Sequence, residues 1–132
     1  MKMLLDSQWI DRENKITVHD PYDDSVIDYV PGASREDAKL ALDAAEKGFK
    51  TARKLTVFER AKILYGAAEI ISKRLEEYAV VIAKESSKTI REARKEAGRC
   101  VNTLIISAEE AKRLLGETIP FDSFPGGENR LG

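Results

Sequence analysis

The hydrophobic positions of this chain change period along its length. In residues 1–31, apolar and polar residues alternate or form short runs, as in "ITVHDPYDDSVIDYV", which is typical of short strands joined by turns. We expect one hairpin turn at Asp6-Ser7 within "MLLDSQWI" and a second turn at "DPYDD". Pro31-Gly32 is expected to end this strand region.

From residue 34 to residue 116 the apolar residues recur every three or four positions, which predicts three amphipathic helices. Gly116 is expected to stop the third of them. Each helix starts with a side chain that can cap its first turn and a carboxylate three residues later. These pairs are Ser34 with Asp37, Thr56 with Glu59, and Thr89 with Glu92.

Each predicted helix has an apolar face, and we expect that of the third helix to point inward. In the first helix it consists of Ala38, Ala41, Leu42, Ala45, Phe49 and Ala52. In the second, which we expect to run unbroken, it consists of Val57, Ala61, Leu64, Ala68, Ile71, Leu75, Tyr78 and Ile82. In the third it consists of Ala93, Ala97, Cys100, Leu104, Ala111 and Leu115. We call the apolar face of the second helix its seam. We expect this seam to pack against the other two helices in the core, and the alternative is that it binds a partner protein.

The segment "ETIPF" predicts one more short strand, followed by the turn residues of "PFDSFPGGENRLG". The fold class is therefore mixed α/β and predominantly helical, with three long amphipathic helices after short N-terminal β-strands. We expect residues 1–132 to form a single incomplete domain. Its parts are a strand region at 1–31, a helical region at 34–116, and the start of a connection to further segments at 117–132.

The charge balance narrows the classes of partner. The chain has 22 Lys and Arg against 23 Asp and Glu, and this net charge of -1 argues against a nucleic-acid partner, which usually selects a basic surface. The single cysteine, Cys100, allows no intrachain disulfide and makes a reducing cytoplasm the default location. The apolar run before Asp6 is too short for a signal peptide, and no stretch approaches the ~20 apolar residues of a membrane span.

Cys100 and His19 are the first residues to test for chemistry. Cys100 is a candidate nucleophile, but its place in the middle of a helix, on the apolar face, favours a buried structural role. His19 lies before Asp20-Pro21, where a turn or surface role is favoured over a catalytic His/Asp pair. One histidine and one cysteine also do not make a usual zinc site.

The remaining candidates are carboxylates and glycines. The ladder of Glu92, Lys95, Glu96 and Arg99 is typical of a solvated helix face rather than an active site. The stretch "PGGENR" has glycines but neither the Lys-Ser/Thr step nor the third spaced glycine of a phosphate loop. The residues by themselves therefore predict a mainly helical domain without a recognisable site.

An ordered series of segments nevertheless resembles one family. The segments are "SQWID", "HDPYDDSVIDYVPGAS", "DAKLALDAAEKGFK", "FERAKILYGAAEIISKR", "AKESSKTIREARKEAGR" and "GETIPFDS" with "PGGENR". In this order they resemble the N-terminal region of the NAD(P)-dependent aldehyde dehydrogenase superfamily. Within that superfamily, the segments most resemble those of lactaldehyde and other small-aldehyde dehydrogenases. The sequence departs from the family at His19-Asp20-Pro21, where Asn-Pro is usual, and at Ser87, which replaces a glycine.

The resemblance implies a parent enzyme that oxidises a small aldehyde with NAD or NADP, using a cysteine thiolate, and that assembles as a homo-oligomer in the cytoplasm, away from membranes. It places the nucleophile, the general base and the coenzyme-binding glycines in later segments of the family. No catalytic, cofactor-binding or metal-binding residue is therefore assigned within residues 1–132, and this chain by itself is expected to be inactive. Some family members hold a monovalent cation, and Glu96 with the Val18 backbone occupies the corresponding places here; a surface salt bridge is favoured for Glu96.

The leading hypothesis is thus the N-terminal scaffold of an aldehyde dehydrogenase, whose partner is the remainder of its own fold. The alternative is a complete helical interaction module without catalysis, which docks a partner or a second copy through the seam of the second helix. The reading frame beyond residue 132 distinguishes the two, as does self-association caused by exposed apolar surface.

Overall fold

The computed structural model describes residues 1–114, 116–123, 125–130 and 132. The predicted Leu115 position of the third helix therefore lies outside the described residues, as do Phe124 and Leu131 of the C-terminal stretch. The elements in chain order are β1 (Met3–Leu5), β2 (Gln8–Ile10), β3 (Lys15–His19), β4 (Val26–Pro31), α1 (Arg35–Ala52), α2 (Val57–Lys73), α3 (Leu75–Ser86) and α4 (Ile90–Ala111). The predicted fold class is confirmed, with four helices among the described residues in place of the three predicted.

The N-terminal strands form two separate antiparallel hairpins, β1–β2 and β3–β4. Asp6 and Ser7 both have positive φ (47° and 63°), the geometry of a tight two-residue hairpin turn, so the turn predicted there is confirmed. In the second hairpin Asp20 N–H donates to the Ser25 carbonyl at 2.8 Å, which closes the predicted "DPYDD" turn. Strand β4 ends at Pro31, as predicted.

The helix starts follow the predicted caps. In each of α1, α2 and α4 the N-cap side chain accepts from the N3 backbone N–H, and the N3 carboxylate accepts from the N-cap backbone. These capping boxes join Ser34 to Asp37, Thr56 to Glu59, and Thr89 to Glu92. Such caps satisfy N–H groups that have no partner inside the helix.

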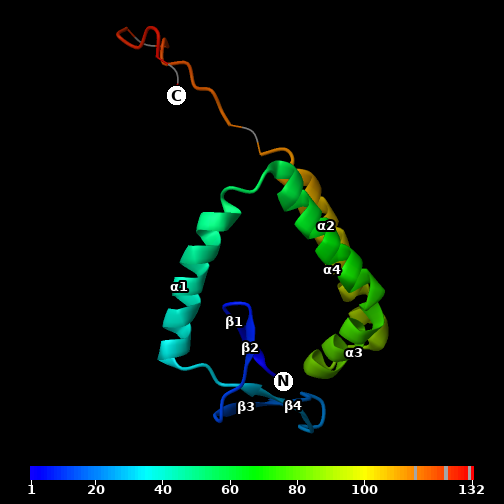
Figure 1. Cartoon of the computed structure of the whole chain (residues 1–132). Coiled ribbons are helices and arrows are strands. Elements are labelled where there is room, and N and C mark those ends of the chain that lie inside the picture. Colours follow the sequence, from blue (N-terminus) through cyan, green and yellow to red (C-terminus); the bar gives the residue numbers. More distant parts are fainter. Residues whose placement is uncertain (115, 124, 131) are drawn as a thin grey trace.

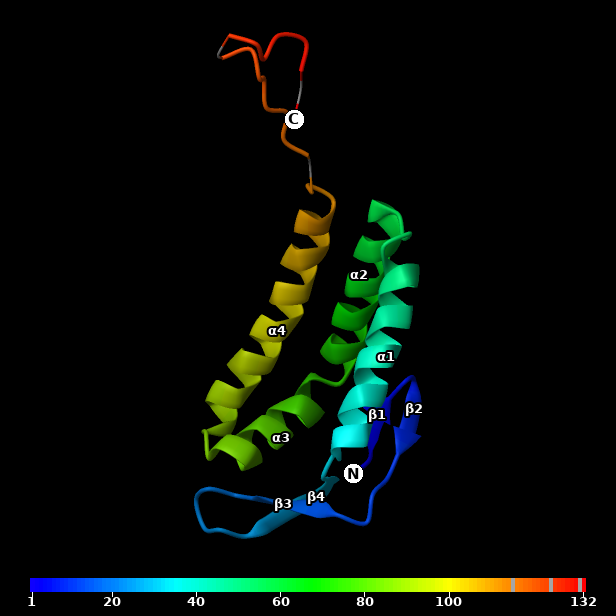
Figure 2. The ribbon, with the colours of Figure 1, turned by 90° about the vertical axis from the view of Figure 1, so that its left-hand side faces the viewer.

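The prediction of one unbroken second helix is wrong, because the backbone leaves helical geometry at Arg74 (φ −114°, ψ 19°). There the Arg74 N–H bonds the Ile71 carbonyl, three residues back, at 3.0 Å. Figure 2 shows α3 bending away from the α2 axis to cross the start of α4. After the bend, Ala79 of α3 lies in a buried cluster with Ala93 and Ala97 of α4.

The core is a thin layer of small side chains between α4 and the α2–α3 pair. In the described part of the chain, its buried apolar residues are Ala61, Ala68, Ala79, Ala93, Ala97 and Ala108. Alanine lets helix backbones approach closely, so two helices pack tightly without large interlocking side chains. The inward positions Ala61, Ala68, Ala93 and Ala97 are confirmed, whereas Val57 and Tyr78 of the predicted seam are exposed.

The apolar face predicted for α1 is exposed in the structure. Leu42 and Phe49 are 71% and 62% exposed, and Ala38, Ala41, Ala45 and Ala52 are exposed as well. Figure 1 shows α1 standing beside the β1–β2 hairpin and apart from the α2–α4 pair. The 3.6-residue period correctly marks an apolar face, but it does not say whether another element covers that face.

The C-terminal end also departs from prediction. α4 ends at Ala111, because the N–H groups of Lys112 and Arg113 bond carbonyls three residues back and tighten the last turn; Gly116 is therefore not the helix stop. Residues 117–121 form no strand but a single bridge at Pro120. Ile119 and Gly132 exchange backbone hydrogen bonds at 2.9 and 3.0 Å, so this segment folds back on itself beyond the end of α4 (Figure 1).

Candidate functional site

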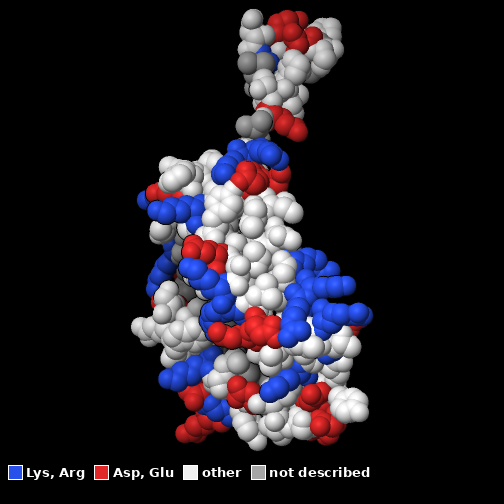
Figure 3. Space-filling model, turned by 90° about the vertical axis from the view of Figure 1, so that its right-hand side faces the viewer, with Lys and Arg blue, Asp and Glu red and all other residues white. Residues whose placement is uncertain are grey.

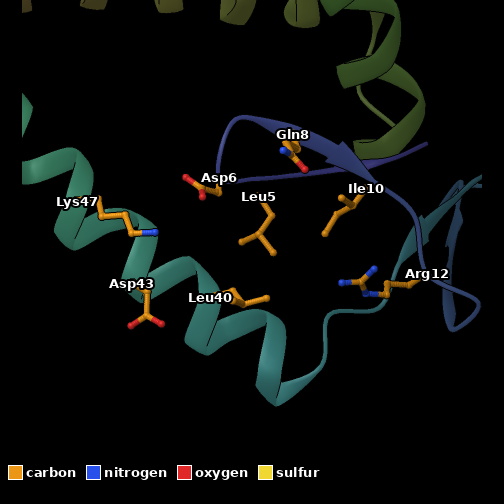
Figure 4. A pocket seen from close by; sticks show the side chains of 8 residues that line it. All are labelled: Leu5, Asp6, Gln8, Ile10, Arg12, Leu40, Asp43 and Lys47. Atoms are coloured by element: carbon orange, nitrogen blue, oxygen red, sulfur yellow. The ribbon is translucent and has the colours of Figure 1, made fainter.

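A hollow of about 320 Å³ separates the β1–β2 hairpin from α1. Figure 4 shows Leu5, Ile10 and Leu40 pointing toward its centre, with the Arg12 guanidinium at one side. The other lining residues are Asp6, Gln8, Asp43 and Lys47. The two hairpin strands supply one wall and successive turns of α1 supply the other, so the hollow depends on how these elements are held together.

Arg12 and Asp37 hold them together. Arg12 Nε lies 3.1 Å from Asp37 Oδ2, and Arg12 Nη2 lies 2.5 Å from Asp37 Oδ1, a two-point ion pair. Asp37 is 3% exposed, and its Oδ2 also accepts from the Ser34 N–H at 3.0 Å. The Arg12 guanidinium and the Ser34 hydrogen bonds hold the pKa of the Asp37 carboxyl far below its usual value. Asp37 is thus ionised at neutral pH, which suits a structural role rather than proton transfer.

Sequence reasoning assigned Asp37 to the cap and missed its second partner. The partner is Arg12, which lies in the short linker between the two hairpins and is 25 residues from Asp37 in the sequence. That distance is why the sequence did not reveal the pair. A similar pair that was missed joins Arg94 of α4 to Glu76 of α3, with Nη2 to Oε1 at 2.6 Å. Both pairs connect elements whose contact depends on tertiary structure, so local spacing does not reveal them.

His19 has the turn role that was predicted. Its Nδ1 lies 2.9 Å from the Asp24 carbonyl oxygen and 3.2 Å from the Asp24 carboxylate, across the β3–β4 loop. The neighbouring Asp20 accepts instead from Ser87 Oγ at 3.0 Å, which ties this loop to the end of α3. His19 and Asp20 therefore do not form a pair with each other.

The predicted burial of Cys100 is wrong, since its side chain is exposed. The inward line of α4 passes through Ala97, Val101 and Leu104, which leaves Cys100 at the edge of the apolar face. In the described part of the chain, no hydrogen bond to the thiol is seen, and His19 lies in a different element. The structure therefore brings the two candidate residues into no common site.

Glu96 forms the surface salt bridge that was favoured for it. Its Oε2 lies 2.6 Å from Lys88 Nζ, and this ammonium lowers the pKa of the Glu96 carboxyl. The proposed ladder is therefore only partly correct, because Glu92 accepts from Thr89 in the capping box instead. Within the described ranges no group of three or more His, Cys, Asp or Glu side chains is placed to hold a metal ion. A cation between Glu96 and the Val18 backbone remains a prediction.

The glycines of "PGGENR" do not form a dinucleotide cradle in the described residues. Gly126 has a positive φ of 93°, and its N–H donates to the Glu128 carboxylate at 2.9 Å. The donor that a phosphate would need is therefore already bound to an anion of the chain itself.

Every helix in the described part of the chain is too short or too polar to cross a bilayer.

Comparisons with known proteins identify what this arrangement belongs to. The sequence model described as "Aldehyde dehydrogenase family" matches residues 9–131. An aldehyde-dehydrogenase-like protein of Sinorhizobium fredii is 46% identical over 89% of this chain and 23% of its own length. The lactaldehyde dehydrogenase of Methanocaldococcus jannaschii is 38% identical over 91% of this chain and 26% of its own.

Among solved structures, the NADP-dependent glyceraldehyde-3-phosphate dehydrogenase of Bacillus halodurans, complexed with NADP, superposes with a TM-score of 0.89 at 27% identity. The superposition covers 96% of this chain and 27% of that one. The chain thus spans about a quarter of the length of the relatives it matches. The match over nearly all residues confirms the resemblance seen in the sequence, and the chain belongs to the aldehyde dehydrogenase family.

Proposed function

We propose that this chain is the N-terminal scaffold of an aldehyde dehydrogenase that oxidises an aldehyde to a carboxylic acid with NAD or NADP. The observation that carries the proposal is the superposition of 96% of the chain on about a quarter of an NADP-dependent enzyme. The names of its relatives support an aldehyde as the substrate class. Small aldehydes such as lactaldehyde are the first substrates to test.

The role proposed for these residues is structural. Asp37 is held ionised by Arg12, Glu96 is paired with Lys88, and His19 closes a turn. Each of these groups is therefore already engaged within the scaffold. The Gly126 N–H donates to Glu128, so this N–H is not free for a phosphate. Coenzyme and substrate would be bound by the remaining segments of the fold.

The organisation proposed for the chain follows from this role. Residues 1–132 are one incomplete domain, in which 1–31 supply the hairpins, 34–116 supply the helices and 117–132 begin a connection. The complete enzyme is proposed to be a cytoplasmic homo-oligomer. A stand-alone helical interaction module is the second candidate, and the observation that favours it is that capping boxes and an ion pair between α3 and α4 fix the helices within this chain.

An activity comparison tests the proposal. The purified 132-residue chain is incubated with lactaldehyde and either NAD or NADP. Reduction of the coenzyme is followed by the absorbance of its reduced form. We expect no turnover by the chain alone and turnover by a fusion of the chain to the remaining three quarters of the Sinorhizobium fredii relative. Aldehyde oxidation by the chain alone would refute the scaffold role. An inactive but folded fusion would refute the proposed enzyme.

A further inference from the structure

The hollow between the β1–β2 hairpin and α1 is left without a function by the scaffold role proposed above. Its volume of about 320 Å³ lies at the lower end of small-molecule pockets and has room for roughly ten heavy atoms. On α1 its lining runs from Leu40 to Lys47, which spans roughly 10 Å along the helix axis. The hollow is therefore long enough for an extended small molecule that lies along α1.

The centre of the hollow is apolar. Figure 4 shows Leu5 and Ile10 of the hairpin facing Leu40 of α1 across it. Leu5 and Ile10 are half-buried and Leu40 is 53% exposed, so each keeps apolar surface in contact with water. Apolar groups of a ligand would remove this surface from water, which is favourable. The middle of the hollow therefore fits an aliphatic chain.

Cationic side chains point into the hollow from its two ends. In Figure 4 the Arg12 guanidinium and the Lys47 ammonium are directed toward the centre. The carboxylates of Asp6 and Asp43 are directed away from it. Arg12 is held at the first turn of α1 by Asp37, and Asp37 and Lys47 are roughly 15 Å apart along the helix axis. Since helix side chains tilt toward the N-terminus, Lys47 reaches back toward Arg12. An anionic group at each end of a ligand would thus meet a cation and would face neither of these two carboxylates.

Arg12 keeps donors for a ligand although it is paired with Asp37. Each terminal nitrogen of a guanidinium carries a pair of N–H groups. Nε and Nη2 donate to the Asp37 carboxylate, and Nη1 donates to the Asp11 carbonyl oxygen at 3.0 Å. Each terminal nitrogen therefore keeps one N–H for which the described part of the chain supplies no acceptor. Because Asp37 already fixes the guanidinium, little side-chain freedom is lost when a carboxylate binds to these N–H groups.

The ammonium of Lys47 is also available to a ligand. On the side of α2, α3 and α4, basic and acidic side chains lie next to one another (Figure 3). Ion pairs there include Arg94 with Glu76 and Lys88 with Glu96, each at 2.6 Å. Within the described ranges Lys47 forms no such ion pair. An anionic end of a ligand can therefore pair with Lys47 without displacing a carboxylate of the chain.

We propose that the hollow binds a medium-chain aliphatic dicarboxylate, a molecule with a carboxylate at each end of an unbranched chain. One carboxylate accepts from the remaining N–H groups of Arg12, and the other pairs with the Lys47 ammonium. The chain between them covers Leu5, Ile10 and Leu40. This inference goes beyond the aldehyde oxidation proposed above and does not depend on it.

Calorimetric titrations of the full chain test the proposal, with octanedioate as the probe. We expect one saturable site per chain, at which octanedioate binds about three- to fivefold tighter than octanoate, the ratio that one partly exposed ion pair supplies. Succinate has both carboxylates but too short a chain, and octanediamine has the opposite charges, so both should bind more weakly than octanoate. The titrations contain neither aldehyde nor coenzyme, so their outcome is independent of the proposed oxidation.

Variants of α1 test the two kinds of contact separately. Lys47→Gln should remove the preference for octanedioate over octanoate, whereas Lys39→Gln, an exposed lysine of the same helix outside the hollow, should keep it. Leu40→Glu should weaken both ligands by at least about tenfold, because it places a charge in the apolar centre. Leu42→Glu, at an exposed position outside the hollow, should leave both unchanged, and circular dichroism should show equal helicity in all variants. Absence of a saturable site, equal binding of octanedioate and octanoate by the parent chain, a preference for the diamine, or equal losses in Lys39→Gln and Lys47→Gln would each overturn the proposal.

Discussion

At the scale of single residues, Asp37 is the most constrained group of the scaffold. It is the one buried charged side chain in the described part of the chain. It accepts hydrogen bonds from Arg12 and from the Ser34 backbone, and so joins the strand linker to the first turn of α1. A buried carboxylate with these partners is stable only while it is ionised, so protonation of Asp37 should loosen α1 from the hairpins.

We predict that the stabilisation contributed by Asp37 is lost at acid pH. The Arg12 pair lowers the folded-state pKa of Asp37 below the ordinary value of 3.8. The contribution of Asp37 to stability is therefore present above pH 3.8 and is lost as the pH falls from there toward the lower folded-state pKa. Urea unfolding should show Asp37→Asn less stable than the parent at pH 7, with the difference shrinking at pH 3. Asp43→Asn, at an exposed position of the same helix, should show no such convergence.

Residue-scale prediction from the sequence was correct where the deciding contacts are local. His19 bonds a residue five positions away, within its own loop, and the turn role predicted for it is confirmed. Cys100 was misplaced because an apolar helix face is broad, and the inward line runs through Val101 instead. A difference of one residue rotates a side chain by about 100° around a helix, which is enough to move it from the core to the solvent.

At the scale of elements, capping signals were predicted better than any other feature. A Thr-x-x-Glu or Ser-x-x-Asp pattern contains both partners of each cap within four residues, and all three predicted boxes form. The bend at Arg74 was missed because the apolar seam continues through it without a change of period. Beyond the bend, Ala79 packs on Ala93 and Ala97 of another helix, a contact that the local period does not reveal.

We predict that the Thr89 cap stabilises α4 measurably. Thr89→Ala removes the hydroxyl that accepts from the Glu92 N–H and should cost about 1 kcal/mol of unfolding free energy. Thr103→Ala is the matched control on the same helix, because the Thr103 hydroxyl donates to the Arg99 carbonyl and supports no helix end. Alanine also has the higher helix propensity, so the control should be neutral or slightly stabilising in urea unfolding. Equal losses in the two variants would contradict a role for the cap.

At the scale of the whole molecule, the sequence predicted the family but not the shape. Ordered motifs spread over nearly the full chain indicated the family, and the family model matches residues 9–131. The separation of α1 from the α2–α4 pair was not predictable in the same way (Figure 1). Amphipathic faces predict that a helix will be covered, whereas the covering element need not lie in the same 132 residues.

The uncovered faces lead to a prediction for the isolated chain in solution. Large apolar side chains such as Leu42, Phe49 and Phe58 are 62% to 72% exposed, and exposed apolar patches of this kind favour association and dye binding. The chain alone should bind anilinonaphthalene sulfonate strongly and self-associate as its concentration rises, while its circular dichroism stays helical. When the remaining family segments are fused to the chain, the dye fluorescence per chain should fall several-fold, because the same side chains become buried. A monomeric chain that binds no dye would show that its faces need no cover, which would favour the stand-alone module over the scaffold.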